Sequence, residues 1–309
     1  MPTSTRACGA PWSGPDGEHG GTMTVLAENL TTADAGRRSL FRGASAARVV
    51  LILAVAWLVA ILACVLVPNV IAPGDPLQIQ PDRILQAPGA TLLGTDQFGR
   101  SVFELLVHGA RISIFIGLAA TVLSLIIGGS IGMIAGYWGG RLDMVIGRLI
   151  DILMCFPGIL LALVIAAALG PSVRNIIIAV GVGNIPSFAR VMRSQVISVR
   201  SRLFIEAARA TGLSHGRILR THILPNSLAP IIVLATIEIG SSIVAAAALS
   251  FLGAGASSGI PDWGTTIARG QPFLNVAWWI TTISGVILTL TVIALSILGD
   301  WLRDRLDTE

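Results

Sequence analysis

The sequence predicts an all-α integral membrane protein with six transmembrane helices. Hydrophobic residues make up 53% of the 309 residues and charged residues only 12%, whereas about a quarter of the residues of a soluble domain are charged. The apolar residues are also gathered into long runs, and a run of about 20 residues is enough for a helix to cross a bilayer. Composition and pattern therefore agree on a membrane-embedded helical fold.

The chain before the first apolar run is rich in Gly, Ser, Thr, Ala and Pro and lacks an apolar period. We expect residues 1–46 to be a disordered cytoplasmic tail, in which Met23 is an alternative start. The first transmembrane helix is expected within residues 47–72, because the apolar run that begins at Val49 meets Pro68. Its length and its distance from the N-terminus favour a retained anchor over a cleavable signal peptide.

Five further spans are expected after a loop at residues 73–110. They form a five-helix core at 111–299, with spans at roughly 112–138, 145–169, 175–189, 228–252 and 277–298. The fourth span is short and is interrupted by Gly181, Gly183, Asn184 and Pro186. Residues 300–309 are expected to form a C-terminal tail.

Arginine supplies all 21 basic residues, and its distribution predicts the orientation of the chain. With the N-terminus in the cytoplasm, most arginines lie on the cytoplasmic side, as the positive-inside rule requires. The arginines left on the outer side are Arg83, Arg100, Arg111, Arg174 and Arg269. Both termini and a long loop at about 190–226 are therefore expected in the cytoplasm, and the loop 73–110 is expected to be extracytoplasmic.

The absence of lysine excludes a P-loop and a Schiff-base site, so any ATP hydrolysis must belong to another chain. Neither H-E-x-x-H nor G-x-S-x-G occurs, and Cys8, Cys64 and Cys155 are too far apart for a metal or disulfide pattern. We expect no catalytic residue, no metal site and no cofactor bound by this chain. The arginines cluster beside apolar runs, which argues against nucleic-acid binding.

The loop at about 190–226 is long and polar, which is typical of a functional or a disordered segment. In it, "FIEAARA" favours a helix, Gly212 can end that helix in a left-handed turn, and "SHGRILRTHIL" returns to an apolar pattern. Two short helices beneath the membrane are expected. Ala207, Ala208 and Ala210 leave the first one slim enough to approach another surface, and Pro225 suits the start of the next span. Alternatively, the arginines serve only to retain the loop in the cytoplasm.

These residues resemble the "EAA" coupling loop of ABC-importer permeases. The matching pattern is Glu206-Ala207-Ala208, then Gly212, then Leu224-Pro225. His222 departs from it, since the general pattern has an aliphatic residue there, but "HILPN" is similar to the dipeptide, oligopeptide and nickel branch. The resemblance implies that an ATPase subunit is coupled through Glu206, Ala207, Ala208, Gly212, Leu224 and Pro225.

Further segments, in the same order along the chain, resemble the C-type permease subunit of that branch. They are "LGTDQFGRSVFELLVHGARISI", "DILMCFPGILLAL", "IPSFARVMRSQV", "LSFLGAGASSGIPDWG" and "LGDWLRDRLD". The resemblance implies a type I ABC importer permease fold in the cytoplasmic membrane of a prokaryote. It also implies a homologous second permease, two ATPase domains that carry ATP and Mg, an extracytoplasmic substrate-binding protein, and surrounding lipids. The implied substrates are di- or oligopeptides, with a nickel chelate or a glutathione-like solute as alternatives.

Small residues and prolines mark helices that approach one another closely or line a pathway. Gly128, Gly132 and Gly136 recur every four residues, which indicates close helix packing, either within this chain or with a second permease. Pro157 and Pro186 remove helical hydrogen bonds, which is tolerated where protein or water satisfies the freed carbonyls. For Pro157 a kink needed only for packing is an equal alternative, whereas Pro186, with Gly183 and Asn184 nearby, favours a pathway.

Glu238 is an acidic residue near the middle of a span, where a carboxylate faces water or a partner by default. In the resembled family a glutamate often precedes "SFLG", but Ala246 stands at that position here, and whether Glu238 takes over its role stays open. The predicted translocation pathway comprises Asn184, Pro186, Glu238, Ser241 and Ser242.

Two other functions fit parts of the sequence. A proton- or ion-coupled secondary transporter would use Glu238 as its coupling carboxylate, although such carriers commonly have repeated halves and several intramembrane ionisable groups. A membrane-embedded enzyme would need a nucleophile, a base or a metal set, and the four histidines are scattered in the tail and the loops.

Overall fold

The structure is a computed structural model that describes residues 44–306 apart from 90, 256–258 and 260. It divides into one unit that ends at Val50 and a second unit from Leu51 onward, and nearly all described residues belong to the second. Residues 1–43 of the expected tail lie outside the described residues. Helix α2 (Ala44–Leu66) crosses the boundary and ends just before Pro68, close to the predicted end of the first span.

Long helices dominate the described part of the chain, so the prediction of an all-α membrane fold is confirmed. Among the described residues, five helical runs are long and apolar enough to cross a membrane, and one bent helix pair raises the number of spans to six at most. The five runs contain α2, α4 (Val102–Trp138), α7 (Val173–Arg200), α10 (Leu224–Leu249) and α12 (Trp278–Leu306). The bent pair comprises α5 (Gly140–Met154) and α6 (Gly158–Leu169).

The predicted third span, 145–169, is not one helix. Helices α5 and α6 meet at 87° across a short break at Pro157. Proline has no N–H to donate and disfavours the α conformation of the residue before it, so the helix ends at this point. On α7, Arg193 forms an ion pair with Asp143 of α5, and Arg190 lies 2.8 Å from Asp151.

Helix α4 begins at Val102, well before the predicted boundary near Ile112. The side chain of Ser101 caps its first turn by accepting a hydrogen bond from the backbone N–H of Glu104. Val102, Leu105 and Leu106 are buried by packing against other parts of the chain. The predicted outer loop 73–110 therefore ends in a helix, and its irregular part contains a short 3₁₀ helix, η1 (Pro81–Arg83).

The fourth predicted span was too short, because α7 runs without a break through its glycines and Pro186. The proline removes the donor to the carbonyl of residue 182. One residue earlier, the hydroxyl of Ser124 donates a 2.7 Å hydrogen bond to the carbonyl of Gly181. Hydroxyl groups on neighbouring helices are one way in which a membrane helix tolerates proline.

The C-terminal helix is also longer than predicted, because α12 continues through Leu306, into the region expected as a tail. Leucine and arginine favour helix, and Arg303 and Arg305 in the last turn suit the negative end of the helix dipole. Near its middle, Thr291 accepts a 3.1 Å hydrogen bond from the indole of Trp57 on α2.

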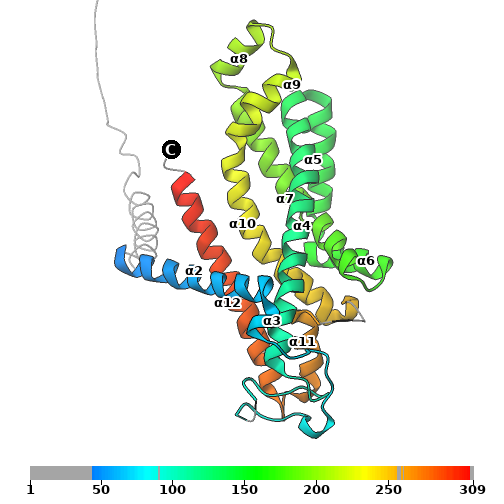
Figure 1. Cartoon of the computed structure of the whole chain (residues 1–309). Helices are drawn as coiled ribbons and strands as arrows, with labels where there is room; N and C mark the ends of the chain where they lie inside the picture. Colours follow the sequence, from blue (N-terminus) through cyan, green and yellow to red (C-terminus); the bar gives the residue numbers. More distant parts are fainter. Residues whose placement is uncertain (1–43, 90, 256–258, 260, 307–309) are drawn as a thin grey trace, which may run out of the picture. The chain divides into compact units, whose positions relative to one another are not determined.

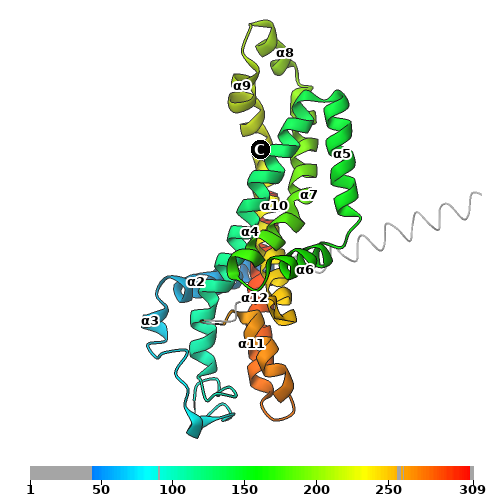
Figure 2. The same cartoon turned by 90° about the vertical axis from the view of Figure 1, so that its right-hand side faces the viewer.

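Helices α4 and α7 share the most extensive interface, and α10 packs against α4, α7 and α12. The remaining short helices are α3 (Pro68–Ile71), α8 (Leu203–Ala210), α9 (His215–Ile218), α11 (Trp263–Gly270) and η4 (Gln271–Phe273), together with the π-helical turns η2 (Leu219–Ile223) and η3 (Ser250–Ala254). Figure 1 and Figure 2 both place α8 and α9 beside the α4–α5 connection, whereas α11 lies near the beginning of α4. Opposite ends of α4 thus meet different parts of the chain.

Candidate functional site

The residues from Leu203 to Ile223, called here the polar segment, begin with a helix that ends in a glycine turn. Gly212 has φ +77°, and its N–H bonds to the carbonyl of Arg209, while the N–H of Leu213 bonds to the carbonyl of Ala208. This pair of hydrogen bonds is the Schellman motif, which needs a residue in the left-handed conformation. The structure therefore has the left-handed turn at the glycine where the sequence predicted it.

The sequence predicted a separate short helix in the second half of the polar segment, and the structure does not have one. Helix α9 continues through a π-helical turn, η2 (Leu219–Ile223), directly into α10. In this turn the N–H of Leu224 bonds to the carbonyl of Leu219, five residues back. Pro225 has no N–H to offer the preceding turn, and wider turns of this kind commonly occur where the regular ladder is interrupted. Leu224 and Pro225 thus lie inside one continuous helical run.

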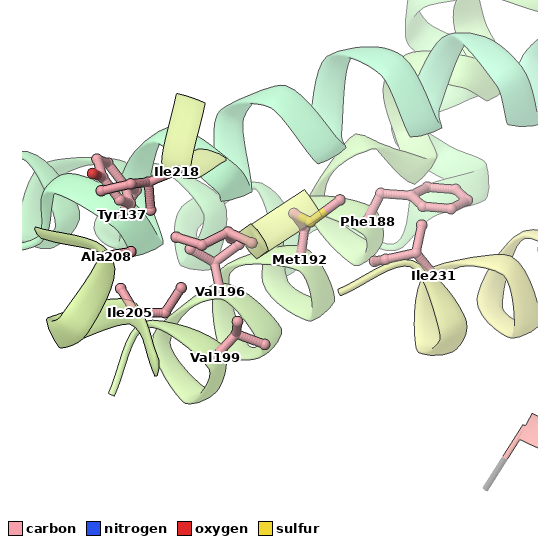
Figure 3. Close-up of a cluster of buried hydrophobic side chains, with 10 residues drawn as sticks. Tyr137, Phe188, Met192, Val196, Val199, Ile205, Ala208, Ile218 and Ile231 are labelled. Atoms are coloured by element: carbon pink, nitrogen blue, oxygen red, sulfur yellow. The ribbon is translucent and has the colours of Figure 1, made fainter. Parts of the chain in front are cut away.

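One face of α8 packs against the rest of the chain. Ile205 and Ala208 are buried in a cluster with Tyr137 of α4 and with residues of α7 and α9, as Figure 3 shows. The remaining members of the cluster are Phe188, Met192, Val196, Val199, Ile218, Ile223 and Ile231. Ala208 is only 7% exposed. Ala208 therefore packs against this chain's own core, and its assignment to ATPase coupling stays a prediction.

The opposite face of α8 is open. Glu206, Ala207 and Ala210 are exposed, and Leu203 at the start of the helix is 81% exposed. Within the part of the chain that the structure describes, the carboxylate of Glu206 makes no hydrogen bond or ion pair. The exposed face thus combines an unpaired charge, small side chains and a large apolar side chain.

Tyr137 lies where the end of α4 meets the polar segment. Its hydroxyl is 2.6 Å from Nδ1 of His215, and the guanidinium of Arg209 stands 5.7 Å from the centre of its ring. Arg200 of α7 donates hydrogen bonds to the carbonyls of Gly136 and Tyr137. Sequence reasoning missed this tyrosine, although it is the chain's only one and lies at the end of a predicted span.

The three glycines predicted to mediate helix packing face α7 of the same chain. A Cβ atom would come within 2.5 Å of the carbonyl oxygen of Ile185 at Gly128, and within 2.3 Å of that of Ala189 at Gly132. At Gly136 the distance to the carbonyl oxygen of Arg193 would be 2.8 Å. Helices α4 and α7 are therefore in backbone contact over two turns, which only glycine permits.

A groove of about 410 Å³ contains two of the residues assigned to the pathway, Asn184 and Ser241. Its walls come from α6, α7, α10 and α12, and its other lining residues are Gly158, Ile159, Ala162, Val180, Val244, Ala245 and Val292. Ser242 is buried behind this surface. Its hydroxyl accepts a 3.0 Å hydrogen bond from Asn184 and lies 3.1 Å from the hydroxyl of Thr121 on α4.

The other two predicted pathway residues do not line this groove. Pro186 is buried within α7. Glu238 is half-buried on α10, one turn before Ser241 and within about 60° of it around the helix. Its carboxylate forms no hydrogen bond or ion pair among the described residues. Glu238 thus lies on the helix face that leads from the groove toward the polar segment.

No group of three or more His, Cys, Asp and Glu side chains in the described part of the chain is placed to hold a metal ion. Cys64 and Cys155 are free thiols. Behind the groove, Asn184 of its lining is joined to the buried Ser242 and Thr121 by hydrogen bonds between uncharged groups. Such an arrangement can orient or admit a polar solute, but it holds no nucleophile activated by a base.

Comparison with known proteins shows which protein family the chain is related to. Residues 128–309 match the family described as "binding-protein-dependent transport system inner membrane component". The dipeptide transport system permease protein DppC of Alkalihalophilus pseudofirmus is 47% identical over 231 residues, which cover 74% of this chain and 76% of that protein. The di/tripeptide transport system permease protein DppC of Pseudomonas aeruginosa is 38% identical over 258 residues, covering 81% of this chain and 85% of the relative.

Two further comparisons extend this picture. The glutathione transport system permease protein GsiD of Pectobacterium atrosepticum is 39% identical over 227 residues, covering 73% of this chain and 75% of that protein. A solved chain of the MetNI methionine ABC transporter in an inward-facing conformation has a TM-score of 0.56 at 19% identity, covering 65% of this chain and 96% of that one. The second likeness shows a shared fold. The chain belongs to the family of binding-protein-dependent transport system inner membrane components, and it is a multi-pass protein of the cytoplasmic membrane.

Proposed function

We propose that this chain is one of two permease subunits of an ATP-driven importer of di- or oligopeptides. It forms the translocation path together with a homologous second permease and couples that path to ATP hydrolysis by separate subunits. The main observation in support of this proposal is the geometry of the polar segment. Its helix α8 ends in a Schellman turn, packs one face on the core and leaves the other face exposed. Relatives that transport dipeptides and tripeptides support the substrate class, and a glutathione-like solute is the alternative that a further relative suggests.

The chain itself hydrolyses nothing in this proposal. Its sequence contains no lysine and therefore no P-loop, so ATP and Mg belong to two ATPase domains outside this chain. The exposed face of α8, with Glu206, Ala207 and Ala210, docks onto an ATPase subunit, and the small alanines permit close approach. Gly212 sets the direction in which the chain leaves α8 toward α9. An extracytoplasmic binding protein delivers the substrate from the other side of the membrane.

The orientation follows from charge. The polar segment carries Arg209, Arg217 and Arg220, with Arg190, Arg193, Arg200 and Arg202 just before it. A concentration of arginine between two spans favours the cytoplasmic side for this segment, and with six spans both termini lie on that side as well. The groove with Asn184 and Ser241 then lies between the two surfaces of the membrane, where it can form one wall of the path. Glu238 faces the cytoplasmic part of this path.

The test uses the reconstituted complex and two substitutions in the polar segment. Ala207→Trp adds bulk to the exposed face of α8, so the permease should still accumulate in the membrane. The amount of ATPase recovered with it should fall about tenfold, because a clashing indole costs an interface at least about 1.4 kcal/mol. Gly212→Val should uncouple ATP turnover from transport, since a left-handed conformation costs a β-branched residue about 1–2 kcal/mol.

The matched control is Ala87→Trp, which adds the same bulk at an exposed alanine far from the polar segment. It should leave ATPase recovery at the wild-type level. Ala208→Trp is unsuitable for this purpose, because Ala208 is buried in the chain's own core and its enlargement would disturb folding. If Ala207→Trp and Gly212→Val both preserve ATPase recovery and substrate-stimulated turnover, the segment is only a topological anchor and the proposal fails.

A further inference from the structure

The polar segment is joined to the long helix α4 at Tyr137, through one side-chain hydrogen bond and one contact between a guanidinium and the ring. Among the described residues, the pair of Tyr137 and His215, 2.6 Å apart, is the one side-chain hydrogen bond from residues 203–223 to a helix outside α10. The other side-chain hydrogen bonds of the segment, made by Thr211 and Thr221, close on its own backbone. The guanidinium of Arg209 also stands over the ring of Tyr137, and the remaining attachment consists of apolar packing, which is not directional.

Further contacts fix Tyr137 itself in place. Its ring is buried at 4% exposure and lies under the guanidinium of Arg209, so the polar segment touches both its hydroxyl and its face. On the other side, Arg200 holds the carbonyls of Gly136 and Tyr137, which are among the last unpaired carbonyls of α4. A displacement of α8 and α9 therefore reaches the end of α4 through a side chain that has little freedom to turn.

Helix α4 then extends from this contact to its other end, which lies beside α11. Its 37 residues span about 55 Å, and the helix contains no proline. Thr121 contacts Ser242 beside the groove. Farther along, Ser113 accepts a 3.0 Å hydrogen bond from the N–H of Trp263, and the carbonyl of Leu106 accepts another from the indole. One helix thus contacts the polar segment, a serine buried behind the groove, and α11.

We propose that Tyr137 is a positioning residue through which movement of the polar segment reaches α4, and that its contact with His215 transmits this movement to the groove and to α11. This inference rests on the proposed function, because it assumes that the segment moves with an ATPase subunit. The glycine contacts with α7 keep the two helices together as α4 shifts, so that the pair moves as one body.

The experiment is a double-mutant cycle in the reconstituted complex of both permeases, the ATPase subunits and the binding protein, with a dipeptide as the probe. Tyr137→Phe removes the hydroxyl and leaves the ring under Arg209, and His215→Ala removes the other partner. Each should lower transport per ATP hydrolysed by roughly 2- to 10-fold, the effect of losing one hydrogen bond. The double variant should be no worse than either single variant, because both remove the same contact.

The readouts separate transmission from folding and from docking. ATPase recovery and the thermal midpoint of the complex should stay at wild-type values, since the apolar cluster is intact. The control is Ser201→Ala, which removes a nearby hydroxyl that bonds only to the carbonyl of Ser198 and should change nothing. The inference is overturned if the single variants transport normally, if their effects add in the double variant, or if the loss follows ATPase recovery. A wild-type complex that binds no ATPase would instead overturn the proposed function.

Discussion

The two ends of α4 are held in different ways. At its beginning, indole groups reach across the fold: Trp263 donates to the carbonyl of Leu106, and Trp279 donates to the carbonyl of Thr95. Asp96 nearby accepts hydrogen bonds from the backbone of Phe98 and from both the backbone and the side chain of Arg100. At the other end, among the described residues, the polar segment makes one side-chain hydrogen bond with α4 and presents Leu203 at 81% exposure.

The two ends differ in the contacts that their side chains make within the chain. At the beginning of α4, the buried indole N–H groups and the buried ion pair have hydrogen-bond partners within the chain. Such satisfied polar groups are typical of a protein interior. Helix α8 instead presents a leucine that is 81% exposed and a glutamate that forms no hydrogen bond or ion pair with the described residues, and a partner can cover such a surface. We therefore expect the α11 end to serve as a fixed base and the polar segment to be the end on which another subunit acts.

The largest expected effect lies at the α11 end. Trp263→Ala empties a site in which the side chain is 1% exposed and removes the hydrogen bond to Leu106. We expect a loss of about 3–5 kcal/mol of stability, seen as a clear fall in the thermal midpoint and in the yield of the purified chain. Trp263→Phe should recover part of it. An unchanged midpoint in Trp263→Ala would contradict the view of this end as a fixed base.

A second substitution tests the connection between the two ends. Gly132→Val puts a side chain where a Cβ atom would already be 2.3 Å from the carbonyl oxygen of Ala189, so α4 and α7 must separate. Overpacking of this kind costs about 1–3 kcal/mol. Gly147→Val is the matched control, because a Cβ atom at that glycine has no neighbour within 4 Å. Equal thermal midpoints for the two variants would show that α4 and α7 are not in close backbone contact at Gly132.

The smallest effect on stability is expected in the polar segment. Leu203→Ser should change the stability of the chain by no more than about 0.5 kcal/mol, since the side chain is almost entirely exposed. It should nevertheless weaken recovery of the ATPase with the complex. Ile205→Ser, two residues away and fully buried, should destabilise the chain itself. Normal ATPase recovery with Leu203→Ser would remove this leucine from the proposed docking surface.

Much of this fold could be predicted from the sequence, because its main signals are local. Apolar runs of membrane length predicted the positions of the spans. Gly212 followed by Leu213 has the composition of a Schellman turn, and the structure has that turn there. The spacing of Gly128, Gly132 and Gly136 indicated a helix contact, but not which helix provides it. The helix that provides this contact is α7, and its position depends on how distant parts of the chain pack.

The remaining features depend on tertiary contacts that have no local signal. Pro157 predicted an interruption, but the 87° bend between α5 and α6 depends on what each helix packs against. Pro186 looked like a similar break, yet α7 continues past it, close to a hydroxyl from α4. Ala207 and Ala208 are the same residue type, and only the packing of α8 on Tyr137 and Val196 separates an exposed position from a buried one.

That difference between the two alanines gives the most direct test of the central claim, that the open face of α8 docks onto an ATPase subunit. Ala207→Cys and Ala208→Cys are made separately in a chain whose native cysteines are replaced by serine, and a membrane-impermeant maleimide is added to inside-out vesicles. With the permeases alone, Ala207→Cys should react and Ala208→Cys, at 7% exposure of the native side chain, should not. Adding the ATPase subunits should protect Ala207→Cys. Equal labelling of Ala207→Cys with and without bound ATPase would contradict the account.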